Sequence, residues 1–233
     1  MRMMVYPDLS CDPVIETLAI HFFVIAPTQA GIEKSDAPNE PWGKEELAKS
    51  LNKLIKTLSV KKPIVVGQSF GGGIAAAYAA LFPEDTAYLI LIDAATSKSD
   101  KYRPLLARIG MSVGVPFYTM FLSNPFVPMY LKRSLVHLVH RAPLKYLSSE
   151  KIKRYKNFVS KRLYDTTVDY KKLQMPLLLI WGDKDTITPI DAAKEIHEEV
   201  HGSKLVVIPG EHTVLYTNPE VVVKAILDNY DGN

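Results

Sequence analysis

The feature of this sequence that most limits its fold is a set of short apolar runs rich in valine, isoleucine and leucine. They read HFFVIAP at 21–27, PIVVG at 63–67, AYLILID at 87–93, PLLLIWG at 176–182 and KLVVIPG at 204–210. Nearly continuous apolar runs of this length are typical of strands that are covered on both faces, as strands are in parallel sheets. The runs therefore predict one parallel sheet.

Segments of helical length and pattern alternate with these runs. They are residues 44–58, 72–82, 190–201 and 219–230. Alternation of strands with helices favours an α/β fold with a doubly wound, mainly parallel sheet. A chain of 233 residues, 47% of them hydrophobic, is long enough to bury one core and to carry a small inserted lobe.

Residues 97–172 interrupt the alternation and differ from the rest of the chain in charge. This segment holds 16 Lys or Arg and four Asp or Glu, so it carries about +12 although the whole chain is +3. It contains no comparable strand pattern and is interpreted as several helices, broken at VGVPF, NPFVP and RAPL. We therefore predict a core at 1–96, a helical cap at 97–172 and the second part of the core at 173–233.

A serine stands between glycines where the run at 63–67 ends. The segment Gly67-Gln68-Ser69-Phe70-Gly71 fits G-x-S-x-G, which is typical of a nucleophile on a sharp turn from a strand to a helix. The following helix directs backbone N–H groups and a partial positive charge to the same place. The alternative is a glycine-rich turn that only connects the two elements or binds a phosphate.

A serine nucleophile needs a base and a carboxylate that orients the base, and candidates for both follow in the chain. Asp185 comes just after PLLLIWG, and His212 comes just after KLVVIPG. Because parallel strands end at one edge of the sheet, we expect Ser69, Asp185 and His212 to converge there. The alternatives are that Asp185 only caps the helix beginning near Pro189 and that His212 is an ordinary loop residue.

With these motifs in order, the chain resembles the α/β-hydrolase family, in particular the members with a helical cap inserted after the sixth strand. The resemblance rests on VIAPTQAGIEKSDAP, GQSFGGGIAAAYAALFPE, WGDKDTITP and GEHTVLYTNPE. It implies that Ser69 is the nucleophile, that His212 is the base and that Asp185 orients it. Asp93, at the end of LILID, stands where some members place the acid instead. The W-G-x-x-D context favours Asp185.

The resemblance also implies two-step acyl transfer on a carboxylic ester, with the Phe70 backbone N–H as one donor to the oxyanion. The family's second donor comes from a loop with a His-Gly pair, which MRMMVYPDLSCDP lacks. Val5 or Tyr6 is the nearest candidate by position. The expected function is thus a carboxylesterase-like serine hydrolase. A carbon–carbon bond hydrolase with the same triad and a non-catalytic ligand-binding protein of this fold are the alternatives. A dehalogenase or epoxide hydrolase is disfavoured, because those enzymes need a carboxylate at the position of Ser69.

The residues before the first predicted strand are few. RMMVY is expected to form one short strand beside PIVVG, followed by a helix that begins at Asp12-Pro13. Strands one and two of the family's sheet are then expected to be absent, and HFFVIAP becomes an edge strand. Exposed edges invite pairing with another chain, so we expect a loop or a second copy, as in a homodimer, to cover it.

The segment HEEVH at 197–201 matches the zinc-protease pattern H-E-x-x-H. Ala192, Ala193, Ile196 and Val200 are expected to form a buried stripe on the same helix, Gly202 is expected to end that helix, and no third ligand follows. We therefore expect His197 and His201 to face solvent, and we interpret His137 and His140 as packing or surface residues of the cap. Neither a metal ion nor a cofactor is expected.

The remaining features concern location and partners. No run of signal-peptide length opens the sequence, Cys11 is the single cysteine, and prolines interrupt the apolar tract at 109–131. We expect a cytoplasmic protein without an integral membrane segment or a nucleic-acid partner, acting on a small ester or acyl substrate. The basic cap favours anionic substrates, although a solvated helix surface would carry the same charge.

Overall fold

A computed structural model describes most of the core and part of the basic segment. The described residues are 2–6, 12–30, 35, 42–102, 117, 120–132, 134 and 168–230. The chain divides into two compact units, one made of 1–27, 48–104 and 166–233 and the other of 28–47 and 105–165. The sheet and the candidate site belong to the first unit.

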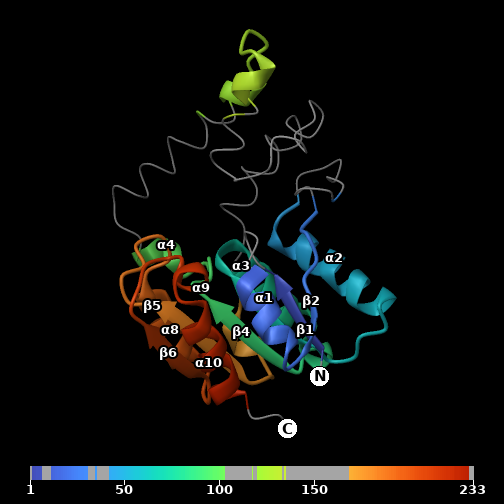
Figure 1. The fold of residues 1–233 in the computed structure, drawn as a ribbon, viewed down its shortest axis with the longest axis vertical. Coiled ribbons are helices and arrows are strands. Elements are labelled where there is room, and N and C mark those ends of the chain that lie inside the picture. Colours follow the sequence, from blue (N-terminus) through green and yellow to red (C-terminus); the bar gives the residue numbers. More distant parts are fainter. Residues whose placement is uncertain are drawn as a thin grey trace. The chain divides into compact units, whose positions relative to one another are not determined.

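Six parallel strands form one sheet in the order β2-β1-β3-β4-β5-β6 (Figure 1). The strands are β1 (Arg2–Tyr6), β2 (Phe23–Ile25), β3 (Ile64–Gln68), β4 (Tyr88–Ile92), β5 (Leu177–Gly182) and β6 (Lys204–Ile208). The prediction of an α/β fold with a parallel sheet is confirmed.

Helices alternate with the strands in the described part of the chain. They are α1 (Asp12–Ala19), α2 (Lys44–Thr57), α3 (Ser69–Leu81), α4 (Ser99–Tyr102), α8 (Ile190–Glu199), α9 (Val214–Thr217) and α10 (Pro219–Asn229), with 3₁₀ turns η1 (Pro83–Asp85) and η3 (Tyr170–Lys172). The helix predicted at 72–82 begins earlier, because the chain turns sharply at Ser69 and enters the helix at once. The helix predicted at 190–201 ends at Glu199, because Val200 takes an extended conformation.

One apolar cluster fills the space between the sheet and helices α1 and α10, which lie on the same side of it (Figure 1). Its buried members include Leu18, Ile64, Ile90, Ile180 and Ile226. Alternate residues of the central strands point to the other face, where α3 and α8 contact the sheet. Both faces of β3, β4 and β5 are buried as a result, and this burial holds their carboxyl ends in fixed positions.

The two edge strands depart from the predicted pattern of burial on both faces. Phe23 of β2 is 65% exposed and Val207 of β6 is 48% exposed. Strand β2 is also shorter than the predicted run at 21–27, because the amides of His21 and Phe22 bond to the carbonyl of Leu18 and continue the turn after α1. An edge strand packs on fewer neighbours, so its apolar residues do not guarantee burial.

Strand β1 lies between β2 and β3, as predicted for RMMVY. Its register sets Met3 opposite Ile64 and Tyr6 opposite Gly67, so the end of β1 lies beside the turn that carries Ser69. The described sheet has β2 at one end, as predicted. Whether a loop or a second copy covers that edge stays a prediction.

The described part of the basic segment contains helical residues and no strand. Residues 120–123 and 129–132 are helical, and Asn124–Pro128 between them is not, which agrees with the predicted break at NPFVP. Here Asn124 accepts a hydrogen bond from the Phe126 amide (2.9 Å). The proposed boundaries at 97 and 172 stay a prediction, because most of this segment lies outside the described residues.

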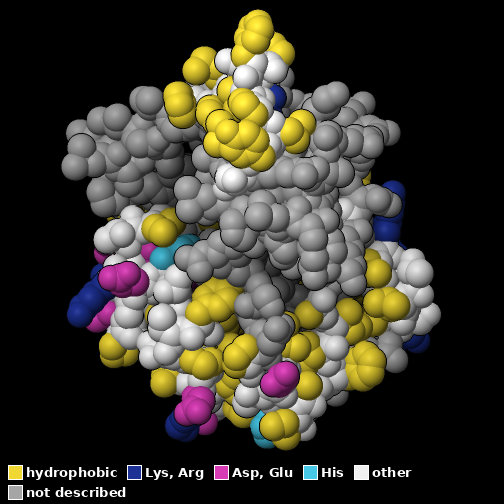
Figure 2. Space-filling view, turned by 45° about the horizontal axis from the view of Figure 1, so that its top comes forward, with side chains coloured by type: hydrophobic (Ala, Val, Ile, Leu, Met, Phe, Trp, Pro, Cys, Tyr) yellow, Lys and Arg dark blue, Asp and Glu magenta, His cyan; other side chains and the backbone are white. Residues whose placement is uncertain are grey.

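Large apolar side chains are exposed around this break, and Figure 2 shows hydrophobic side chains gathered there. Those at least one-third exposed are Phe117, Met120, Phe126, Met129, Tyr130 and Leu131. Among the described helices, none is both long enough and apolar enough to cross a membrane.

Candidate active site

The turn from β3 into α3 holds Ser69 in a conformation that few residues adopt. Ser69 has φ +48° and is 8% exposed. A Cβ at Gly67 would lie 2.4 Å from the carbonyl oxygen of Gly71, and one at Gly72 would lie 2.4 Å from the Cβ of Ala94. The glycines are therefore required by close packing of the turn on α3 and on the chain after β4. The Ala95 amide also donates to the Ser69 carbonyl (2.7 Å).

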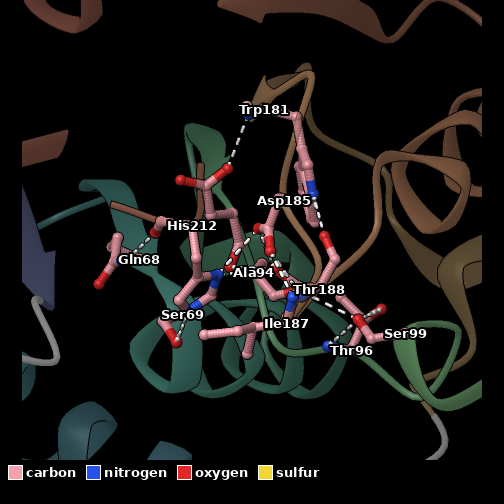
Figure 3. Close-up of polar contacts among 12 residues, drawn as sticks. Gln68, Ser69, Ala94, Thr96, Ser99, Trp181, Asp185, Ile187, Thr188 and His212 are labelled. Atoms are coloured by element: carbon pink, nitrogen blue, oxygen red, sulfur yellow. Dashed lines mark hydrogen bonds and ion pairs between the residues drawn. The ribbon is translucent and has the colours of Figure 1, made fainter. Parts of the chain in front are cut away.

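His212 lies in the loop between β6 and α9 and points at Ser69 (Figure 3). Its Nε2 is 2.7 Å from Ser69 Oγ. The side-chain amide of Gln68 donates to the His212 carbonyl (3.3 Å), so the residue before the serine also holds the histidine loop. This geometry lets Nε2 accept the proton of the serine hydroxyl, which is what a general base for a serine nucleophile must do.

Asp185 lies in the loop after β5, on the far side of the imidazole ring. Its Oδ2 is 2.8 Å from His212 Nδ1, and its side chain is fully buried. The loop also approaches the histidine loop closely, since a Cβ at Gly182 would lie 2.6 Å from the carbonyl oxygens of Gly210 and Glu211. Ser69, His212 and Asp185 thus converge at one edge of the sheet, as the sequence predicts.

The helix-capping alternative for Asp185 is wrong, because α8 is preceded by Pro189 and has no side-chain cap, but Asp185 does shape the turn before that helix. Its Oδ1 accepts hydrogen bonds from the amides of Ile187 and Thr188, both at 2.8 Å, just before α8 begins at Ile190. One carboxylate therefore shapes the turn with one oxygen and contacts His212 with the other. The turn fixes the orientation of the oxygen that faces the histidine.

Asp93, the other position considered for the acid, lies nearby but bonds elsewhere. It follows β4 with φ +43°, is fully buried, and its Oδ1 accepts a hydrogen bond from the Gly182 amide (2.9 Å). Burial raises the pKa of Asp93 to about 7, and the charge of Asp185 adds to this rise. Asp185, rather than Asp93, is the carboxylate within hydrogen-bond distance of His212.

Thr188 belongs to the same network, and the sequence analysis missed it. Its side-chain oxygen lies 2.6 Å from Asp185 Oδ2 and 3.0 Å from His212 Nδ1. The signal available in the sequence was its position three residues after Asp185 and directly before Pro189, where a Thr hydroxyl can bond back to the aspartate that begins the turn.

The two predicted oxyanion donors lie near the turn from β3 into α3 that carries Ser69. Phe70 follows Ser69 in the first turn of α3, and Tyr6 ends β1 opposite Gly67. The Tyr6 side chain lies outside the described part of the structure, and the role of both residues stays a prediction.

The HEEVH segment lies only partly within a helix. Helix α8 ends at Glu199, so His201 lies in the turn beyond it, which corrects the prediction that both histidines lie on the helix. Both side chains are exposed, and His197 Nδ1 is 2.7 Å from Ser203 Oγ. The described residues contain no group of three His, Cys, Asp or Glu side chains that could hold a metal ion. His137 and His140 lie outside the described residues.

The members of the predicted apolar stripe are buried. Ala192, Ala193 and Ile196 lie on α8, whereas Val200, inside HEEVH, lies just beyond the end of the helix.

Comparison with known proteins relates this chain to hydrolases. A family model described as "alpha/beta hydrolase fold" matches residues 7–219. The "Uncharacterized hydrolase YugF" of Bacillus subtilis is 23% identical over 199 residues, covering 79% of this chain and 71% of that protein. A 2-hydroxy-6-oxononadienedioate/2-hydroxy-6-oxononatrienedioate hydrolase of Klebsiella pneumoniae is 24% identical over 210 residues, covering 83% of this chain and 70% of that one.

Relatives and solved structures differ in how much of their length the chain spans. It covers only 65% of the uncharacterized protein Rv2715 of Mycobacterium tuberculosis, to which it is 25% identical over 229 residues, or 87% of this chain. A thermophilic esterase from Thermogutta terrifontis superposes with a TM-score of 0.73 at 21% identity, covering 98% of this chain and 88% of that one. At this identity the likeness concerns the fold.

Proposed function

Because the chain belongs to the alpha/beta hydrolase fold family, we propose that it is a serine hydrolase that cleaves carboxylic esters through an acyl-enzyme on Ser69. The family supports a hydrolase in general. The assignment of Ser69 as the nucleophile rests on one observation, the continuous path from Ser69 Oγ through the imidazole of His212 to Asp185 Oδ2, with contacts of 2.7 and 2.8 Å.

In the first step, Ser69 Oγ attacks the ester carbonyl carbon while His212 Nε2 takes the hydroxyl proton. The imidazolium then gives that proton to the leaving alcohol, and the acyl group stays on Ser69. In the second step, His212 takes a proton from water as the water oxygen attacks the acyl carbon. The imidazolium then gives that proton to Ser69 Oγ as the bond from Oγ to the acyl carbon breaks and the acid leaves. Asp185 stays ionised throughout, holds Nδ1–H toward itself and stabilises the imidazolium.

The oxyanion formed in each step needs donors that are already in place. We assign one to the backbone N–H of Phe70, directly after the nucleophile at the N-terminus of α3, where helix amides point at a developing negative charge. We assign the second to the backbone of the Tyr6 region, since β1 ends opposite Gly67. This replaces the His-Gly loop that the sequence lacks.

Carbon–carbon bond hydrolysis is the second candidate, and the similarity to the Klebsiella hydrolase favours it. A dioate substrate, as in that protein's name, carries two negative charges. The charge of about +12 on residues 97–172 suits such a substrate, and it equally suits an anionic ester. A non-catalytic binding protein is the third reading, because the oxyanion loop departs from the family's pattern.

Further parts of the proposal concern assembly and location. We propose that a second copy pairs along the β2 end of the sheet, which is the edge in the strand order. A cytoplasmic location is proposed from the single cysteine of the chain.

The deciding experiment combines turnover with labelling. The full chain is incubated with p-nitrophenyl esters of short and medium acyl length and with a fluorophosphonate probe, and the labelled residue is identified by mass spectrometry. We expect the label on Ser69. Replacement of Ser69 by Ala or of His212 by Ala should lower kcat by several orders of magnitude, since the members of such a unit act together.

Three results would contradict the proposal. They are a label on another serine, ester turnover by Ser69→Ala within a few-fold of the parent, and an active parent that cleaves a dioate carbon–carbon substrate but no ester. The last result would favour the second candidate, and no turnover of either substrate class would favour the binding protein.

A further inference from the structure

A threonine hydroxyl lies at the centre of the acid–base pair. Thr188, in the loop between β5 and α8, is fully buried. Its Oγ1 lies 2.6 Å from Asp185 Oδ2, 3.0 Å from His212 Nδ1 and 3.1 Å from the carbonyl oxygen of Asp93 (Figure 3). These three contacts come from two loops and from the end of β4.

The chemistry of the three neighbours assigns the proton of the Thr188 hydroxyl and the proton of the imidazole. A hydroxyl has one proton to donate and two lone pairs that accept. The carbonyl oxygen of Asp93 and the carboxylate of Asp185 only accept, and the shorter distance assigns the proton to Asp185. Oγ1 therefore accepts from His212 Nδ1–H, which is present in the tautomer whose Nε2 accepts the proton of Ser69.

We propose that Thr188 is a positioning residue for the catalytic histidine. Its hydroxyl holds Asp185 Oδ2 in place and is a second acceptor for His212 Nδ1–H, so the imidazole is fixed by two acceptors rather than one. The inference rests on the proposed function, in which His212 is the base.

The hydroxyl cannot easily turn away from these partners. The Thr188 amide donates to Asp185 Oδ1 (2.8 Å), and the Thr188 carbonyl accepts from the indole N–H of Trp181 (2.6 Å). Trp181 is itself fully buried at the end of β5. The backbone of Thr188 is thus bound on both sides, and a β-branched side chain has few alternative rotamers.

Asp185 depends on this hydroxyl for part of its hydrogen bonding. Its oxygens take part in four contacts, with the amides of Ile187 and Thr188, the Thr188 hydroxyl and His212 Nδ1. A carboxylate offers about four such acceptor sites. Loss of the hydroxyl would leave Oδ2 held by His212 alone and would let the carboxylate and the ring move together.

The test compares substitutions that separate the hydroxyl from the shape of the side chain. Thr188→Val keeps the shape and the backbone bonds but removes the hydroxyl, and Thr188→Ser keeps the hydroxyl. We expect Val to lower kcat about tenfold with KM within about twofold, as for a lost hydrogen bond that acts in the transition state. Ser should stay within about threefold of the parent. Thr188→Ala replaces the valine variant if valine fails to fold by circular dichroism.

A matched control is available at Thr96. This threonine is also buried, and its hydroxyl contacts Ser99 (3.2 Å) rather than the triad. Thr96→Val should therefore keep the parent's kcat and KM. An equal fall in kcat for the Thr96 and Thr188 valine variants would show that loss of any buried hydroxyl suffices, and would overturn the proposal.

A second test uses proton NMR spectroscopy and does not depend on turnover. The downfield proton resonance of His212 Nδ1–H is assigned in the parent by its absence in His212→Gln. We expect it to move in Thr188→Val and to stay in Thr188→Ser and Thr96→Val, because only the first removes an acceptor. An unmoved resonance in folded Thr188→Val would overturn the proposal. If the parent cleaves no ester, the proposed function fails and this resonance alone decides the role of Thr188.

Discussion

Two buried aspartates end up at the same edge of the sheet with different surroundings. Asp93 follows β4 and Asp185 follows β5, and these strands are neighbours. Asp185 takes part in four hydrogen-bond contacts, one of them with His212. Asp93 Oδ1 accepts from the Gly182 amide, and Asp93 Oδ2 is buried without a close hydrogen-bond partner among the described residues. Burial is alike in the two, so hydrogen bonding is what separates them.

The difference assigns the two carboxylates separate tasks. Four contacts orient the Asp185 carboxyl and direct one of its oxygens at His212, whereas burial raises the pKa of Asp93 to about 7. Asp93 instead connects elements, since its carboxyl accepts from Gly182 and its carbonyl lies 3.1 Å from the Thr188 hydroxyl. It thus connects the end of β4 to the loop that carries Asp185.

The strongest test of this comparison is to remove each charge in turn. Asp185→Asn should lower kcat for a p-nitrophenyl ester by about 10³–10⁴-fold, because the amide no longer holds the required histidine tautomer. Asp93→Asn should lower it by no more than about tenfold, because Asp93 has no hydrogen bond to His212 among the described residues. Steady-state kinetics on both purified variants provides the measurement.

A reversed order of effects would break the comparison and would move the acid to the end of β4. Circular dichroism at the assay temperature serves as the control, because loss of fold at either position would lower activity for another reason.

The second prediction concerns stability against pH. The folded-state pKa of Asp93, about 7, lies above its ordinary value of 3.8, so the folded protein holds this proton more tightly than the unfolded chain. The resulting stabilisation is fully present below about pH 4 and is lost as pH rises through 7, a change on the order of 4 kcal/mol. Asp93→Asn should remove this slope.

Urea unfolding at pH 5 and pH 8 measures this pH dependence of the free energy of unfolding. The fall in the free energy of unfolding between the two values should be smaller in Asp93→Asn than in the parent. Comparing the two proteins cancels the contribution of other titrating groups. Equal falls in both would mean that Asp93 is ionised at little cost, and the contrast with Asp185 would disappear.

The local patterns of the sequence predicted the central part of this site well. Continuous apolar runs predicted β3, β4 and β5, and Ser69, Asp185 and His212 follow strand ends that the topology must bring to one edge. The edge strands were predicted less well, because burial there depends on neighbours that the local sequence does not specify. Their exposure and the short length of β2 follow from that.

The finer parts of the site could not be predicted for a different reason. The W-G-x-x-D context already favours Asp185 over Asp93, but the Thr188 hydroxyl becomes significant only once His212 lies beside it. Likewise, HEEVH matches a helical pattern, but the helix ends at Glu199 because Val200 leaves the helical conformation. Such features arise from tertiary contacts and have no periodic signal.

The smallest predicted effect belongs to a third carboxylate, Glu195, which is hydrogen-bonded like Asp185 but keeps 20% of its side chain exposed. Glu195 of α8 bonds to Lys98 (2.9 Å), Tyr102 (2.7 Å) and Lys101 (3.0 Å). The hydrogen bond from Lys98 lowers its pKa most, and those from Tyr102 and Lys101 add to this, giving a value of about 2. Its stabilisation is thus present above about pH 4.5 and is lost as pH falls through 2.

Glu195→Gln tests whether hydrogen bonds alone, without full burial, let a carboxylate contribute to the stability of the fold. We expect the melting temperature at pH 7 and low salt to fall by about 2 °C or less, because solvent screens exposed ion pairs. Added salt should shrink the difference. Asp191→Asn, which breaks the single exposed pair with Lys194, is the matched control and should change less. If Glu195→Gln lowered the melting temperature as much as Asp185→Asn does, hydrogen-bond donors alone would account for the stability that a carboxylate contributes. If the melting temperature fell only at low salt, burial would be what makes the contributions of Asp185 and Asp93 to stability larger.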